Sequence, residues 1–204
     1  QIMALQAQIN PHFLNNTLEM MNWQARMADD LKVCRMIEAL GTVLDHSMNR
    51  SGRKTVYLSE ELRCVDSYLY IMSMRFGQRM QAEREVDEGL LRMEVPQLIL
   101  QPIIENAIYH GIDRMVEEGC IQIRIEEEET AIRMTVTDNG VGMSEEQCKE
   151  ILHREAGERT GIGIKNVNDR IRIYFGEEYG LHITSELDEG TCVEIRIPKL
   201  TELE

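Results

Sequence analysis

Three short segments carry glycines or polar side chains that could contact a ligand. The first is Asp138-Asn-Gly-Val-Gly142, which directly follows a predicted strand. Gly140 and Gly142 let the backbone approach a ligand closely, and the carboxylate of Asp138 can accept a hydrogen bond from an exocyclic amine. Taken alone, the segment is equally typical of an ordinary turn.

The second segment, Thr160-Gly-Ile-Gly-Ile-Lys-Asn166, places Gly161 and Gly163 at the predicted start of a helix. The free N–H groups and the positive dipole end of such a helix attract a phosphate. Glycines at this place also occur for structural reasons, so the segment indicates a phosphate site only together with the others.

The third segment, Gln101-Pro-Ile-Ile-Glu-Asn106-Ala-Ile-Tyr-His110, places an amide in a mostly apolar helix. A buried amide needs hydrogen-bond partners. Asn106 is therefore either a satisfied core residue or a ligand for a Mg²⁺ ion bound to phosphate, since Mg²⁺ prefers oxygen donors.

The composition limits the classes of protein to which the chain can belong. Its 204 residues suffice for one large domain or two small ones. The formal net charge of −14 would repel a nucleic-acid backbone, so direct binding of nucleic acid is not expected. The five cysteines have neither zinc-site nor disulfide-framework spacing, which favours a reducing compartment.

Residues 1–53 are predicted to form two helices. Apolar side chains follow a helical stripe through the first helix, whereas Gln8, His12 and Asn16 lie on a different, polar face. An aspartate of the turn at 28–30 is expected to cap the second helix. Two such helices cannot bury their apolar faces alone, so they either pair with a second copy in a four-helix bundle or form an intramolecular layer.

From residue 54 onward the pattern becomes mixed. The predicted elements are helices over 59–76, over 96–110 and after Gly163, and strands over 121–125, 132–136 and 193–197. Each strand alternates apolar with polar residues, which is typical of a strand with one face in water. Helices on one face of a largely antiparallel sheet make an α+β sandwich. Residues 1–53 and 54–204 are thus predicted to be two domains.

In this order and spacing, the three segments resemble the nucleotide-binding boxes of the ATPase superfamily shared by histidine kinases, DNA gyrase, the large heat-shock chaperone and mismatch-repair ATPases. The resemblance implies that ATP and Mg²⁺ bind residues 54–204, with Asn106 as the metal ligand and Asp138 as the acceptor for the adenine amine. The segment 143–160 would be the lid over ATP. The resemblance places the other cofactor-binding residues at His110, Gly140, Gly142, Gly161, Gly163 and Thr191.

The segment Gln6-Ala-Gln-Ile-Asn-Pro-His-Phe-Leu-Asn-Asn-Thr-Leu18 closely resembles the phosphoacceptor motif of LytS/YesM-type sensor histidine kinases. Leu58-Ser-Glu-Glu-Leu62 and Arg75-Phe76 are similar to motifs of the same family, so the resemblance covers nearly the whole chain. It implies that His12 is phosphorylated and that the phosphoryl group then passes to an aspartate in the receiver domain of a response regulator.

The chemistry of His12 agrees with this role, because an imidazole is largely neutral and nucleophilic at physiological pH. Pro11 beside it either kinks a continuous helix or begins a new helix that Asn10 caps. Asn16, one turn after His12, matches in spacing the polar residue that positions water for dephosphorylation in other histidine kinases. Phosphatase activity is therefore a further hypothesis.

The chain also departs from the family pattern. Asn15 replaces an apolar or aromatic residue, Tyr109 replaces a lysine that would add positive charge near the phosphates, and Asp45-His46 replaces an Arg-Tyr pair. Many other histidine kinases have an acidic residue directly after the histidine, where this chain has Phe13. Glu105 is then the candidate for the general base, and a solvated helix residue is the alternative for it.

Together these observations predict the dimerisation and catalytic core of a sensor histidine kinase. It would act as a homodimer with a hinge near Ser51-Gly52, as the cytoplasmic portion of a bacterial cell-membrane sensor whose membrane segments lie outside this chain. One alternative is a hydrolytic ATPase of the same superfamily, against which Pro102 argues because it occupies the place of a water-activating glutamate. Another is a nucleotide-binding scaffold without catalysis, which Asn15 and Tyr109 keep open.

Overall fold

The computed structural model of the protein describes residues 11–48, 53–151 and 162–199. Gly161, the hinge predicted near Ser51-Gly52 and residues 152–160 of the predicted lid lie outside the described residues. The same holds for Asn10, so both interpretations of Pro11 stay predictions.

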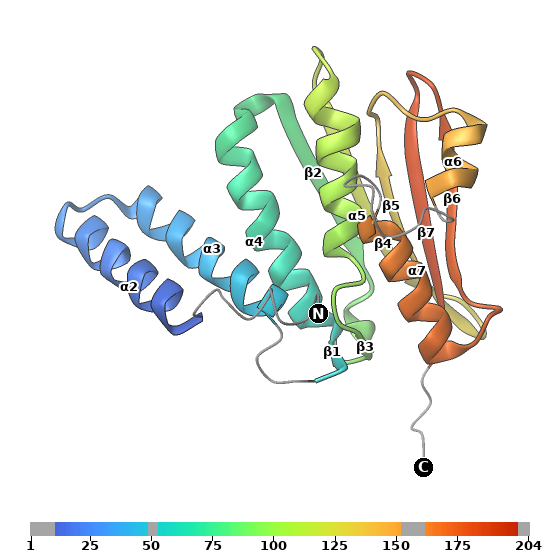
Figure 1. Cartoon of the computed structure of the whole chain (residues 1–204), viewed down its shortest axis with the longest axis horizontal. Coiled ribbons are helices and arrows are strands. Elements are labelled where there is room, and N and C mark those ends of the chain that lie inside the picture. Colours follow the sequence, from blue (N-terminus) through green and yellow to red (C-terminus); the bar gives the residue numbers. More distant parts are fainter. Residues whose placement is uncertain (1–10, 49–52, 152–161, 200–204) are drawn as a thin grey trace, which may run out of the picture.

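The N-terminal part is a helical hairpin (Figure 1), as the apolar pattern predicts. α2 (Pro11–Met27) and α3 (Leu31–Met48) contact each other and are joined by a short turn. The carboxylate of Asp30 accepts a hydrogen bond from the backbone N–H of Val33 at 3.1 Å, which caps the start of α3. The predicted turn and its aspartate cap are confirmed.

The hairpin leaves a row of apolar side chains exposed on α2. Phe13, Met20 and Met27 are 64%, 61% and 71% exposed. They are spaced by seven residues, which places them on one helix face. This row, called here the α2 apolar row, is therefore not covered within the described part of the chain. None of the described helices is long and apolar enough to cross a membrane.

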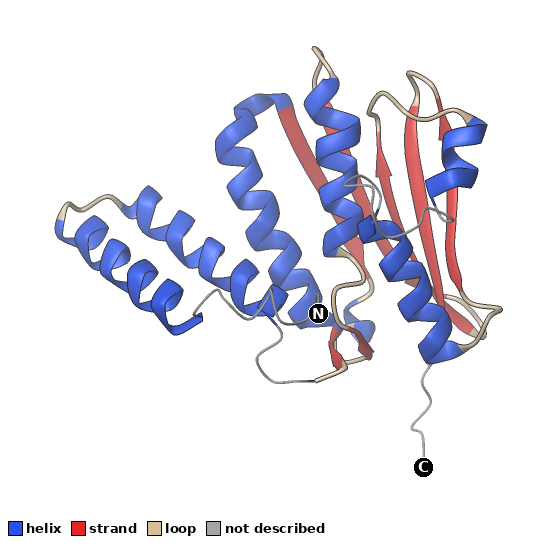
Figure 2. Ribbon diagram, in the orientation of Figure 1, coloured by secondary structure: helices blue, strands red, loops and turns tan. Residues whose placement is uncertain are grey.

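The rest of the chain is an α+β sandwich in which helices cover one face of a sheet (Figure 2). The main covering helices are α4 (Leu58–Phe76), α5 (Gln101–Asn106) and α7 (Ile162–Phe175). The sheet has the order β2-β4-β5-β7-β6, made by β2 (Met80–Val86), β4 (Gly119–Glu127), β5 (Ala131–Asp138), β7 (Gly190–Pro198) and β6 (Gly180–Glu186). Only β2 and β4 pair in parallel, so the largely antiparallel sheet is confirmed.

Smaller elements complete the fold. β1 (Thr55–Tyr57) and β3 (Glu94–Pro96) form a separate antiparallel ladder. α6 (Glu145–Ile151) contacts β6. The short helical turns are Gly77–Arg79, Glu88–Leu90, a π-helical turn Ala107–Gly111 and Ile112–Arg114.

Alternating burial along the strands forms the core. On β4, Ile121, Ile123 and Ile125 are almost fully buried under the helices, whereas Gln122 and Arg124 are exposed on the open face. This is the one-sided burial that the alternating sequence predicts. β2 and β6 lack so regular an apolar alternation because they are the edge strands of the sheet, and the sequence pattern does not predict them.

The helix predicted to begin near Pro96 begins instead at Gln101. Pro96 belongs to β3, where it pairs with Thr55, and residues 97–100 form a bend. The carboxylate of Glu61 on α4 accepts hydrogen bonds from the backbone N–H groups of this bend. A contact between residues so far apart in sequence overrides the local apolar pattern.

The helices follow one another across the molecule in the order α2, α3, α4, α5, α7, and each contacts the next (Figure 1). α2 is therefore the outermost helix at one edge. α5 and α7 lie on the other side of α4, where they cover the sheet.

Candidate active site

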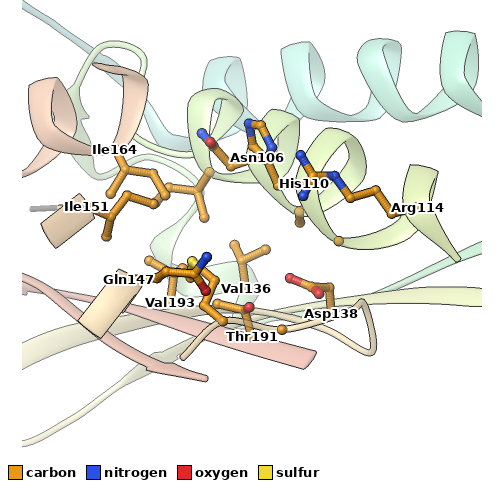
Figure 3. Close-up of a pocket in the computed structure, with 15 residues that line it drawn as sticks. Asn106, His110, Arg114, Val136, Asp138, Gln147, Ile151, Ile164, Thr191 and Val193 are labelled. Carbon is orange, nitrogen blue, oxygen red and sulfur yellow. The ribbon is translucent and has the colours of Figure 1, made fainter. Parts of the chain in front are cut away.

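A pocket lies between the helical layer and the sheet (Figure 3). It holds about 970 Å³ of space, part of which is open to solvent. The lining residues are Ile103, Asn106, Ala107, His110, Gly111, Arg114, Val136, Asp138, Gly142, Met143, Gln147, Ile151, Ile164, Thr191 and Val193.

The pocket brings together five residues that the sequence assigns to cofactor binding. Asn106 and His110 project from the helical wall, and Asp138, Gly142 and Thr191 belong to the sheet side. Residues far apart in sequence thus line one space because the π-helical turn Ala107–Gly111, which continues α5, contacts β5 and β7. The helix widens into its π-helical turn at this wall, a feature that is frequent at functional sites.

Asp138 ends β5 and is only 6% exposed. Its Oδ1 accepts a hydrogen bond from the backbone N–H of Gly140 at 2.8 Å. Burial raises the pKa of Asp138 to about 6, although hydrogen bonds from the backbone of Gly140 and Thr191 act in the opposite direction. A buried carboxylate at a pocket wall can accept a hydrogen bond from the amine of a bound base.

Glycines beside Asp138 allow the two walls of the pocket to meet. A Cβ atom at Gly140 would lie 2.3 Å from the Cα atom of Gly111 on the helical wall. Gly142 has a φ of 63°, and a Cβ atom there would lie 1.8 Å from the carbonyl oxygen of Glu186. Only glycine fits these positions. Gly111, whose role the sequence analysis missed, is detectable only as a glycine at the end of an apolar helix.

Thr191 is held by a hydroxyl network behind the pocket. The Oγ atom of Ser185 donates to the carbonyl of Gly190 at 2.7 Å and accepts from the N–H of Met143 at 2.8 Å. It also lies 2.8 Å from Oγ1 of Thr191, which must donate because Ser185 has only one hydroxyl hydrogen. Ser185 thus joins the segment after Gly142 to the start of β7, and the sequence pattern gives no signal for it.

The side-chain amide of Asn106 is oriented by a hydrogen bond to the backbone. Its Nδ2 atom donates to the carbonyl of Pro102 at 2.6 Å, which leaves its Oδ1 atom as a possible ligand. The described residues hold no cluster of three His, Cys, Asp or Glu side chains that could bind a metal by itself. The Oδ1 atom of Asn106 suits a Mg²⁺ ion that takes its other ligands from phosphate oxygens and water.

Gly163, at the start of α7, lies beside Asn106. A Cβ atom on it would lie 3.3 Å from the ring of Pro102 and 3.6 Å from Nδ2 of Asn106. Of the predicted lid, α6 contributes Gln147 and Ile151 to the pocket.

Glu105 does not line the pocket. Its Oε1 atom accepts a hydrogen bond from Nε2 of Gln101 at 2.8 Å, and its charge raises the pKa values of Cys64 and Tyr68 on α4. The burial of Cys64 and of Tyr68 is the larger cause of both shifts. This placement favours a structural role for Glu105 over that of a general base.

Arg114 is a pocket residue that the sequence analysis missed. Its side chain extends back along the pocket toward His110 (Figure 3). It is the one Lys or Arg side chain among the described lining residues, and within the described chain no hydrogen bond or ion pair is found for it. Tyr109, which replaces the family lysine, is 47% exposed and does not line the pocket.

His12 is exposed in the first turn of α2. The Nδ2 atom of Asn16 lies 3.3 Å from Nδ1 of the imidazole. The two residues therefore contact each other, as their spacing of four predicts, and the ring is accessible from solvent. Both belong to the outermost helix and not to the pocket.

Two protein-family models match this chain, one in its N-terminal part and one in its C-terminal part. Residues 1–80 match the model of the family described as "Histidine kinase", and residues 94–201 match "Histidine kinase-, DNA gyrase B-, and HSP90-like ATPase". The chain belongs to the histidine kinases of this ATPase family. The resemblance and the α+β sandwich that it implies are thereby confirmed.

Several curated proteins are similar to this histidine kinase core. "Sensor histidine kinase YesM" of Bacillus subtilis is 38% identical over 97% of the chain and 33% of its own length. "Sensor protein LytS" of Oceanobacillus iheyensis is 32% identical over 95% of the chain and 34% of its own length. The chain thus spans about a third of the length of these relatives.

Solved structures share the fold of this histidine kinase core. The histidine kinase domain of the Erythrobacter litoralis EL346 blue-light activated histidine kinase has a TM-score of 0.53 at 20% identity, covering 88% of this chain and 84% of that one. The catalytic domain of histidine kinase ThkA has a TM-score of 0.51 at 24% identity, covering 71% of this chain and 95% of that one.

Proposed function

We propose that the chain is the dimerisation and catalytic core of a sensor histidine kinase, which transfers the γ-phosphoryl group of ATP to His12. The observation that carries the proposal is the convergence of Asp138, Thr191 and Asn106 on one pocket in a chain that also presents an exposed histidine on a helical hairpin. Residues 1–53 would serve as the dimerisation and phosphotransfer part and residues 54–204 as the ATP-binding domain.

In this proposal each pocket residue has a separate task. The carboxylate of Asp138 accepts the adenine amine, and Thr191 and Gly142 shape the space for the base. Asn106, His110 and Gly163 are proposed to contact the phosphates, and so is Gly161, which lies outside the described residues. Mg²⁺, held by Asn106 and the phosphates, would neutralise charge on the phosphoryl group.

The transfer step itself needs a nucleophile and good positioning. A nitrogen of the neutral His12 ring forms a bond to the γ-phosphorus, while the bond from this phosphorus to the bridging oxygen breaks and ADP leaves. The proton on the other ring nitrogen can pass to water, since the ring is exposed. No role for Glu105 is needed in this step.

The phosphoryl group is proposed to pass next to an aspartate in a response regulator receiver domain. A second copy of the chain is proposed to cover the α2 apolar row. The chain is also proposed to be the cytoplasmic portion of a membrane sensor, and the names of two relatives support the sensor role alone. Asn16, 3.3 Å from the ring of His12, is proposed to position water for dephosphorylation.

Incubation with γ-labelled ATP and Mg²⁺ tests this proposal. Wild type should acquire a label that acid removes and base does not, and His12→Ala should acquire none. Asn16→Ala should still be labelled but should lose the label more slowly, if Asn16 positions water. ATP binding without any label on wild type would favour a scaffold, and release of free phosphate by His12→Ala at the wild-type rate would favour a hydrolytic ATPase.

A further inference from the structure

The bend at residues 97–100 is held by a buried carboxylate. Glu61 is fully buried on α4, and its two oxygens accept hydrogen bonds from the N–H groups of Leu98 (2.6 Å), Ile99 (3.1 Å) and Leu100 (3.2 Å). Leu98 has a φ of 60°, a left-handed conformation that is strained for a leucine. The carboxylate therefore stabilises a backbone shape that the local sequence disfavours.

The same bend connects two walls of the nucleotide pocket. Its carbonyl groups at Gln97 and Leu98 accept hydrogen bonds from the guanidinium of Arg170 on α7. Its last residue leads directly into α5, the helix that carries Asn106. The shape of the bend thus fixes how α5 and α7, which both border the pocket, lie relative to α4.

His46 of the hairpin contacts both Glu61 and the bend. Nε2 of His46 on α3 lies 2.5 Å from Oε1 of Glu61, and the His46 side chain is only 10% exposed. The backbone carbonyl of His46 accepts a further hydrogen bond from Nε2 of Gln97 at 2.6 Å. Both contacts cross from the hairpin to the ATP-binding domain.

We propose that His46 and Glu61 are a positioning pair that docks the hairpin on the ATP-binding domain in a resting arrangement. In this arrangement α3 and α4 stand between α2, which carries His12, and the helices that border the pocket (Figure 1). Transfer to His12 therefore requires the ATP-binding domain to move, and the pair opposes that movement. This inference rests on the proposed function, because it concerns the rate of phosphorylation of His12.

The pair is tested by separating nucleotide affinity from the rate of transfer. His46→Ala removes the contact with Glu61. His46→Gln keeps an amide nitrogen that can donate a hydrogen bond to Glu61. His182→Ala is the control, because it removes an exposed histidine from the open face of the sheet. At saturating ATP, His46→Ala should form phosphohistidine at least threefold faster than wild type, with a dissociation constant for ATP within twofold of the wild-type value. His46→Gln and His182→Ala should resemble wild type. An unchanged or slower rate in His46→Ala would overturn the proposal.

A measurement that needs no catalysis keeps the two proposals distinct. Amide hydrogen exchange in residues 43–48 and 97–100 should be faster in His46→Ala than in wild type, while exchange in β4 and β5 should be unchanged. If wild type forms no phosphohistidine, the proposed function fails. Amide hydrogen exchange alone then tests whether His46 and Glu61 dock the hairpin on the ATP-binding domain. Equal exchange of both segments in variant and wild type would exclude docking through His46.

Discussion

Asp138 is the buried residue that we propose to recognise the nucleotide. It ends β5 with 6% of its surface exposed, and this burial raises its pKa to about 6. The ionised carboxylate is the form that accepts the adenine amine without first releasing a proton. Nucleotide affinity should therefore depend on the protonation of this single group.

ATP affinity is expected to fall as the pH falls through 6, by up to about tenfold per pH unit, because binding must then displace one proton from Asp138. Above about pH 7 the carboxylate is already ionised and the dependence from this source should vanish. Calorimetric titration from pH 5 to 8 measures the effect. Asp138→Asn is the control, since the titration of the nucleotide is common to both proteins. The same pH dependence in both would contradict the assignment.

Arg114 is expected to contribute to nucleotide affinity, because it is a pocket cation without a partner among the described residues in a chain of net charge −14. Arg114→Ala should weaken ATP binding by about 3–10-fold, the size of one solvent-accessible charged contact. Arg92→Ala removes an exposed arginine that does not line the pocket and should leave binding unchanged. Equal affinities for Arg114→Ala and wild type would show that Arg114 does not contact ATP.

Among the elements, those with a periodic local pattern could be predicted and those set by distant contacts could not. The hairpin and β4 follow from apolar spacing, and the pocket residues Asn106 and Asp138 follow from a motif. The start of α5 does not, because a carboxylate on α4 holds the preceding bend. No sequence pattern indicates Ser185 or Arg114 as site residues either, because their roles depend on which elements the fold brings together.

The contact between the helical wall and β5 should be sensitive to one added methyl group. A Cβ atom at Gly111 would lie 2.6 Å from Oδ1 of Asp138, so Gly111→Ala should lower the free energy of unfolding by about 1–3 kcal/mol. Gly41 in α3 has no atom within 4 Å of such a Cβ atom, so Gly41→Ala should be stabilising by about 0.5–1 kcal/mol. Urea denaturation of both variants measures the difference. A Gly111→Ala protein as stable as wild type would refute this tight packing.

At the scale of the whole molecule, the α2 apolar row is a surface that the described part of one chain does not bury. Phe13, Met20 and Met27 are each more than half exposed on a single face. Such a row next to the exposed His12 suits a second hairpin, which would complete a four-helix bundle. The dimer would then place two phosphoacceptor histidines and two ATP-binding domains in one assembly.

Replacing Met20 and Met27 together by Gln should raise the dimer dissociation constant by at least tenfold, because two apolar side chains then no longer gain from burial. Val116→Gln is the matched control, since Val116 is 94% exposed on the ATP-binding domain. Light scattering over a concentration series measures the masses. Wild type that stays monomeric, or a double variant that dimerises like wild type, would refute this role of the row.

ATP bound near Asp138 and Asn106 is proposed to phosphorylate His12 on the outermost helix. Tandem mass spectrometry at neutral pH, after incubation with ATP and Mg²⁺, tests it most directly because it identifies the modified residue. We expect phosphate on His12, and less of it on Asp138→Asn at an ATP concentration that does not saturate this variant. Phosphate on a different residue, or an unmodified His12 in a protein shown to bind ATP, would contradict it.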